Sequence, residues 1–182
     1  MKPEIKHNTL LFGLLLAALS IGYSTIAYVV DESLFVHWFL GIGLLVIGAL
    51  LLIMSVWQTK KALGGYISFR DAFSAWILPA MLSSALVMVF NMLLYNVIDT
   101  DLADRLGVRI MEQTTEMMER FGAADEQVEE AMAKVDETSM SVNFKPLGLL
   151  KGFFTELILQ SVFAALFAAI FKKEKPVFDS AT

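Results

Sequence analysis

The sequence has no cysteine, only two histidines and little charge. Without cysteine among its 182 residues, the chain has no disulfide, no thiol nucleophile and no zinc–thiolate site. His7 and His37 lie near the ends of different apolar segments, so they do not indicate a metal site. Charged residues make up 18 % of the chain, and 14 lysines and arginines against 19 aspartates and glutamates give a net charge of −5. This balance excludes the basic surface that nucleic-acid binding requires, so no nucleic-acid partner is expected.

Motifs of the common enzyme classes are also missing. The sequence has no phosphate-binding glycine loop, no GxSxG, no HExxH and no pair of carboxylates within an apolar segment. We therefore predict a protein that is not an enzyme, with no catalytic residues, no bound metal and no cofactor.

Apolar residues dominate what is present, at 57 % against about 45–50 % in an average soluble domain. Four apolar runs cover residues 9–30, 34–57, 72–98 and 147–171, each longer than the roughly 20 residues that cross a membrane as a helix. The first run is too long for a signal peptide and no clear cleavage site follows it, so we expect it to remain as an anchor. The sequence predicts an all-α fold, a four-transmembrane-helix bundle that forms a single membrane domain over residues 1–182.

Lysine and arginine mark one side of these four runs. They occur in residues 2–6, 58–71 and 172–175, whereas the connector 31–33 has none. Positively charged flanks stay in the cytoplasm, so we expect both termini and the 58–71 loop there. Residues 99–146, with five basic and twelve acidic residues, are then extracytoplasmic.

Residues 99–146 form a polar insert with helical periodicity. Asp101 is expected to cap a helix over residues 102–121 and to pair with Arg105, and Gly122 is expected to end it. A second helix would complete a helical hairpin, which either pairs its two apolar faces or covers the top of the bundle. Methionines on these faces suit partner binding. The apolar face of the first helix consists of Leu102, Leu106, Ile110, Met117 and Phe121.

Polar side chains within the apolar runs are candidates for a functional site, because burying them in lipid is unfavourable. Lys151 is close enough to the end of its run to reach the membrane surface, but Glu156 lies deeper and Gln160 follows one turn later. Two interpretations remain open: a hydrogen-bonded pin between helices, and a site that binds a proton or ligand. The predicted intramembrane polar cluster consists of Glu156, Gln160, Asn91, Tyr95 and Tyr23.

Local signals predict helix ends and helix contacts. A Gly64–Gly65 turn precedes Ser68 and Asp71, whose spacing is typical of a helix cap. Small residues at helical spacing indicate close contacts between spans. In the second run these are Gly41, Gly48 and Ser55.

Three stretches resemble a known protein family: GGYISFRDAF at 64–73, NMLLYNVID at 91–99 and the Phe171–Lys173 end of the last run. The family is domain of unknown function 4199, a group of small bacterial membrane proteins typical of Bacteroidetes. The resemblance implies a four-span protein of the bacterial inner membrane. It implies no activity and supplies no catalytic residues.

The function predicted from these features is that of a non-enzymatic structural or partner-binding membrane component. Membrane lipid is one expected partner, and a second copy or another membrane protein is expected to bind through the 99–146 insert. The alternative is a small oligomeric channel or transporter that uses Glu156. A polar cavity at Glu156 would favour transport, whereas an exposed apolar patch on the insert would favour binding.

Overall fold

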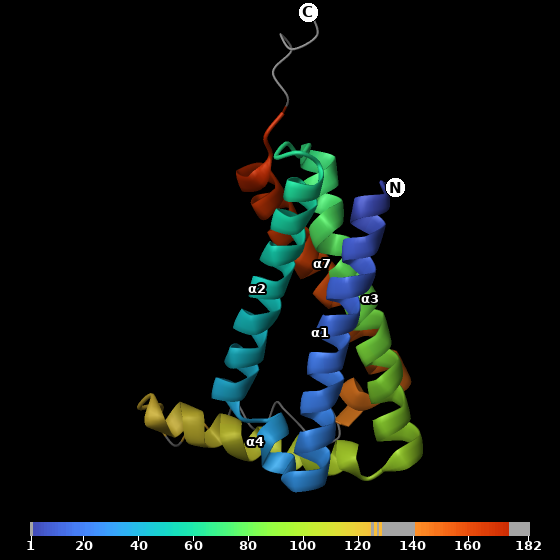
Figure 1. Cartoon of the computed structure of the whole chain (residues 1–182). Helices are drawn as coiled ribbons and strands as arrows, with labels where there is room; N and C mark the ends of the chain where they lie inside the picture. Colours follow the sequence, from blue (N-terminus) through green and yellow to red (C-terminus); the bar gives the residue numbers. More distant parts are fainter. Residues whose placement is uncertain (1, 125, 127, 129–140, 175–182) are drawn as a thin grey trace, which may run out of the picture. The chain divides into compact units, whose positions relative to one another are not determined.

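A computed structural model describes residues 2–124, 126, 128 and 141–174, and these residues are almost entirely helical (Figure 1). Short helical turns lie before two of the long helices, and a third long helix continues into a π-helical turn. Four of the five α-helices in the described ranges are long: α1 Pro3–Val30, α2 Trp38–Ala62, α3 Phe69–Leu93 and α7 Pro146–Phe171. The others are α4 Leu102–Arg120, η1 Glu32–Phe35, η2 Leu94–Ile98 and η3 Val142–Phe144.

The prediction of four long apolar helices is confirmed. The helices α1, α2, α3 with η2, and α7 have 28, 25, 30 and 26 residues and are apolar enough to cross a membrane. The helix of the second span begins at Trp38, four residues after the start of the predicted apolar run. Leu34 belongs instead to η1, where the Asp31 carboxylate accepts a hydrogen bond from the Ser33 N–H at 2.8 Å and caps a separate turn.

Two compact units make up the chain, and each long helix contributes residues to both. Unit 1 consists of Met1–Ser20, Leu44–Leu86 and Phe154–Thr182. Unit 2 consists of Ile21–Gly43 and Val87–Phe153.

The core of unit 1 is built from small and aromatic side chains. Trp76 of α3 stacks on Phe167 of α7, with ring centroids 4.5 Å apart. A Cβ added at Gly13 would lie 2.8 Å from the Leu82 side chain, so glycine permits close approach of α1 to α3. The predicted small-residue contacts of α2 hold at Ser55, which donates to the Ala75 carbonyl at 2.7 Å, but a Cβ at Gly41 would meet nothing within 4 Å. The buried cluster also contains Leu16, Leu52, Val56, Ile67, Ala72, Ala75, Ala80, Ala164 and Ala168.

The turn between α2 and α3 follows from its glycines. Gly64 and Gly65 have φ of +79° and +85°, and their N–H groups bond back to the carbonyls of Lys61 and Lys60, which ends α2 in a Schellman motif. At the start of α3 the Ser68 hydroxyl accepts from the Asp71 N–H at 3.1 Å and donates to the Asp71 carboxylate at 2.8 Å. These contacts satisfy donors that the first turn of α3 would otherwise leave free.

The core of unit 2 joins the end of α3 to the start of α4. Leu94, Tyr95, Leu102 and Leu106 form its buried cluster. The predicted cap at Asp101 is wrong, because its side chain makes no capping bond.

Asp99 takes the capping role at α4. The Leu102 N–H donates to the Asp99 carboxylate at 3.1 Å. The helix ends at Arg120, one residue before the predicted end, and Gly122 follows with φ of +80°. The second helix of the predicted hairpin falls almost wholly outside the described residues.

Candidate functional site

Two side-chain hydrogen bonds join α3 to α7 within unit 1. The Ser84 hydroxyl donates to Glu156 Oε1 at 2.8 Å, and the Trp76 indole N–H donates to Gln160 Oε1 at 2.9 Å. Trp76 and Ser84 are buried, at 2 % and 7 % exposure. Because lipid offers no competing partner, such bonds hold neighbouring spans in one register.

Glu156 is the single acidic residue of α7 and lies about 15 Å along the helix from its first residue. Its side chain is exposed, and Ser84 is its one hydrogen-bond partner among the described residues. A proton relay needs a chain of titratable groups, and a metal site needs several ligands. The described residues hold no group of three or more His, Cys, Asp or Glu that could bind a metal ion.

The three other residues of the predicted polar cluster belong to unit 2, where contacts are seen for the two tyrosines. The Tyr23 hydroxyl donates to the carbonyl of Leu34. Tyr95 is buried between Phe35 and Phe144, at centroid distances of 6.4 and 5.0 Å. Asn91 Oδ1 is buried and has no hydrogen-bond partner among the described residues. A single cluster of all five residues therefore stays a prediction.

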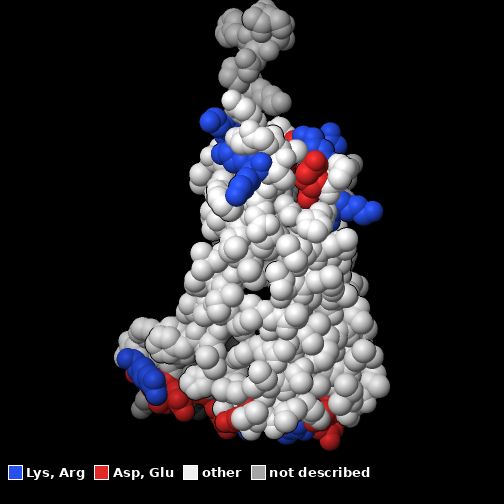
Figure 2. Space-filling view, in the orientation of Figure 1, with Lys and Arg blue, Asp and Glu red and all other residues white. Residues whose placement is uncertain are grey.

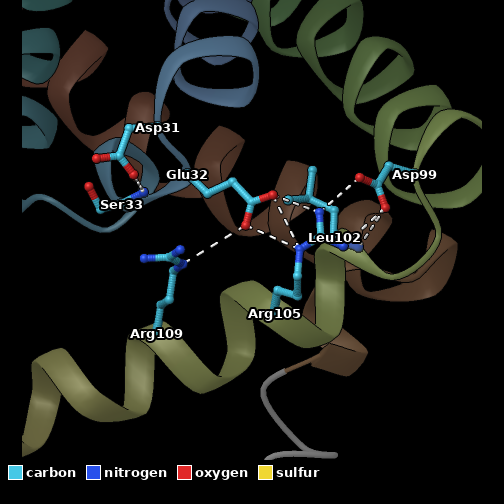
Figure 3. A network of polar contacts seen from close by, with 7 residues as sticks. All are labelled: Asp31, Glu32, Ser33, Asp99, Leu102, Arg105 and Arg109. Carbon is cyan, nitrogen blue, oxygen red and sulfur yellow. Dashed lines mark hydrogen bonds and ion pairs between the residues drawn. The ribbon is translucent and has the colours of Figure 1, made fainter.

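A network of ion pairs holds α4 to the η1 turn in unit 2 (Figure 3). The Arg105 guanidinium contacts the Glu32 carboxylate at 2.7 Å and the Asp99 carboxylate at 2.8 Å. Arg109 lies 3.9 Å from Glu32. The predicted ion pair between Arg105 and Asp101 is wrong, because the guanidinium pairs instead with two carboxylates outside α4.

These contacts shift the pKa values of the groups involved. Hydrogen bonds from Arg105 are the main reason that the pKa of Asp99 is held below its usual value. Glu32, and then Asp99, raise the pKa of Arg105, which stays charged. Asp99 and Arg105 are therefore both charged at neutral pH.

The two halves of α4 differ in their surroundings. Leu102 and Leu106 are 0 % and 1 % exposed, whereas Met117 and Phe121 are 40 % and 85 % exposed. The prediction that Met117 and Phe121 share the buried face is therefore wrong. The physical reason is that α4 contacts its neighbours only along its first half. Arg109 is the last residue of α4 with an ion pair to η1, and the distal end of α4 projects beyond the described rest of unit 2 (Figure 1).

Sequence reasoning missed several of the residues that make these contacts. Asn8 and Thr59 form a buried bond of 2.8 Å between α1 and α2, although they are 51 positions apart. Glu32 and Arg105 are 73 positions apart, and no motif connects them. The one signal that could have found Arg105 is its place as an isolated cation near the start of an acidic insert.

Four helices that are long and apolar enough to cross a membrane define the class: a multi-pass helical membrane protein. A family model described as protein of unknown function, DUF4199, matches residues 11–173, so the chain belongs to that family. The resemblance seen at residues 64–73 is thereby confirmed. No curated protein and no solved structure gives a significant match.

Proposed function

We propose that this protein is a non-enzymatic membrane component that binds a protein partner through the distal half of α4. The observation that carries the proposal is the exposure of Met117 and Phe121, at 40 % and 85 %, on a helix whose first half is fixed by Arg105. An exposed apolar edge on a positioned helix is typical of a binding surface, and methionine adapts to partners of varied shape. The expected partner presents an apolar helix face, either from a second copy or from another membrane protein.

The proposed location is a bacterial inner membrane, with both termini and the 58–71 loop in the cytoplasm. The charge distribution supports this orientation, because lysine and arginine are concentrated in residues 2–6, 58–71 and 172–175, whereas residues 31–37 have none and the five in residues 99–146 are outnumbered by twelve acidic residues. In this orientation α4 lies on the extracytoplasmic side.

Site-specific crosslinking tests the proposal in intact cells. A photoreactive phenylalanine analogue at position 121 should give an adduct of one discrete mass on irradiation. The matched control places the same analogue at Glu112, on the charged face of α4, and should give no adduct. Co-expression of a second, differently tagged copy shows whether the adduct joins two copies. Adducts to lipid alone, or the same adduct from both positions, would contradict the proposal.

The alternative function, a small oligomeric channel or transporter, rests on the position of Glu156, an ionisable side chain midway along a spanning helix. The neighbouring contact argues against it. Trp76 and Gln160 bond between the same two helices with no charge at all, so the Glu156–Ser84 bond completes a pair of structural contacts. We therefore propose that Glu156 is a pin between α3 and α7.

A further inference from the structure

A groove in unit 1 combines charged and apolar side chains between the start of α1 and the first turns of α3. Its volume is about 460 Å³, and Arg70, Ser74 and Leu78 line it along one face of α3. Leu78 lies about 12 Å further along the helix than Arg70. Along the N-terminal segment the lining changes in the same way, from Lys2, which precedes α1, to Ile5 in its first turn. The groove is therefore charged at the end of the helices and apolar deeper along them.

The charges of this groove are only partly compensated. Asp71, which also lines it, accepts an ion pair from Lys2 at 2.6 Å and a hydrogen bond from Ser68 at 2.8 Å. Arg70 is exposed and has no ion-pair partner among the described residues. The groove thus keeps one unpaired guanidinium.

The surroundings of the groove are basic. The described part of unit 1 contains seven lysines and arginines against four aspartates and glutamates. In Figure 2 most of the charged side chains visible at the upper end are basic. An anion that approaches Arg70 therefore meets an attractive field.

We infer that this groove binds an anionic phospholipid, with the phosphate against Arg70 and Lys2 and an acyl chain along Ile5 and Leu78. A guanidinium matches phosphate oxygens in geometry and charge, and basic pockets between spanning helices take anionic headgroups. The apolar wall selects lipid over free phosphate, because a soluble anion makes no use of Ile5 or Leu78. The site involves no residue of α4 and is independent of the proposed function.

Native mass spectrometry of the full chain in mild detergent tests the inference. Phosphatidylglycerol should bind more tightly than phosphatidylcholine with the same acyl chains. Arg70→Ala should weaken phosphatidylglycerol binding about five-fold, as expected for one cation near a membrane surface, and Arg70→Lys should retain most of it. The matched control is Lys6→Ala, which removes an exposed cation of α1 outside the groove.

A second variant tests the apolar wall. Leu78→Trp leaves the charges intact and fills the groove, so it should also weaken phosphatidylglycerol binding, with thermal unfolding reporting that the variant is folded. Equal binding of the two lipids, or equal loss in Arg70→Ala and Lys6→Ala, would overturn the inference. Stabilisation by inorganic phosphate that matches that by phosphatidylglycerol and survives Leu78→Trp would identify a soluble-anion site instead, and would also overturn it.

Discussion

A carboxyl group midway along a spanning helix is unfavourable unless a neighbouring helix supplies a donor. For Glu156 this donor is the Ser84 hydroxyl, at 2.8 Å. Glutamine offers the same acceptor oxygen in the same place and lacks only the ability to ionise. Comparing glutamate with glutamine at position 156 therefore distinguishes a structural role of this side chain from a role that requires it to titrate.

We predict that Glu156→Gln is nearly silent. The thermal midpoint of the detergent-purified protein should change by less than about 2 °C, which for a chain of this size is below roughly 1 kcal/mol. Glu156→Ala should destabilise by about 0.6–1.7 kcal/mol, the range for hydrogen bonds between spanning helices. Thr155→Ala, at the adjacent exposed position, is the control. A Glu156→Gln variant of normal abundance that loses a pH-dependent phenotype would show that the carboxyl titrates in function.

At the scale of single residues, the sequence identifies only one of the two residues in each hydrogen bond between α3 and α7. Glu156 and Gln160 are conspicuous because they interrupt an apolar run. Their partners are not, since Trp76 and Ser84 lie 84 and 72 positions away. Ser84 shares a helix face with Asn91 and Tyr95, so periodicity cannot choose among them. Only the packing of α3 on α7 makes the choice.

Within single elements, two glycines of α7 should respond oppositely to the same substitution. A Cβ at Gly148 would lie 2.3 Å from the Val142 carbonyl oxygen, a backbone atom of η3, whereas a Cβ at Gly152 would meet nothing within 4 Å. Gly148→Ala should therefore destabilise by about 1–3 kcal/mol, as overpacking does. Gly152→Ala should be neutral or stabilise by up to about 1 kcal/mol through helix propensity. Thermal unfolding of both variants measures the difference, and a stabilising Gly148→Ala would show that α7 does not contact η3 in this way.

The attachment of α4 to η1 gives a prediction for hydrogen exchange. Arg105→Ala removes the ion pairs to Glu32 and Asp99, so amides in the first two turns of α4 should exchange faster. Exposed pairs contribute only about 0.2–1 kcal/mol each, so the effect should be a several-fold change in rate rather than unfolding. Arg109→Ala, whose one ion pair is at 3.9 Å, should have less effect. Equal exchange in both variants would show that apolar packing alone holds α4.

Acid should act on the same attachment. The pKa of Asp99 is lowered in the folded state, so its contribution to stability is present above its usual value of about 3.9 and is lost as the pH falls below that value. Exchange of the first turns of α4, corrected for intrinsic rates, should therefore rise below about pH 4 in the unmodified protein. The Arg105→Ala variant should lack this rise. A rise of the same size in the variant would assign it to other carboxylates.

The elements themselves could be predicted more fully than their connections. Apolar runs were sufficient to locate the four long helices, although α1 begins six residues before its run and α2 ends five residues after its run. Gly122 located the end of α4 to within one residue. The start of α2 was missed by four residues, because Leu34 and Phe35 are apolar but belong to the capped η1 turn. Exposure along α4 could not be predicted, since a helical wheel shows which residues share a face and not how far the neighbouring elements extend.

On the scale of the whole molecule, orientation is the property that charge predicts. A reporter fused after Lys175 should be active in the cytoplasm, and one inserted near Ala123 should report the extracytoplasmic side, because basic flanks remain in the cytoplasm. A third fusion in the 58–71 loop serves as an internal standard for the cytoplasmic side. Finding the first two reporters on the same side would contradict a four-span topology.

Trp76 gives the molecule an optical property. It is 2 % exposed, stacked on Phe167 and bonded to Gln160, whereas Trp38 and Trp57 are 49 % and 53 % exposed. Replacing the two exposed tryptophans with phenylalanine leaves a single emitter at the contact between α3 and α7. Indole fluorescence shifts to longer wavelength when its surroundings become more polar. Separation of these two helices would then be measured as a shift of the tryptophan emission maximum, in a protein that carries no attached dye.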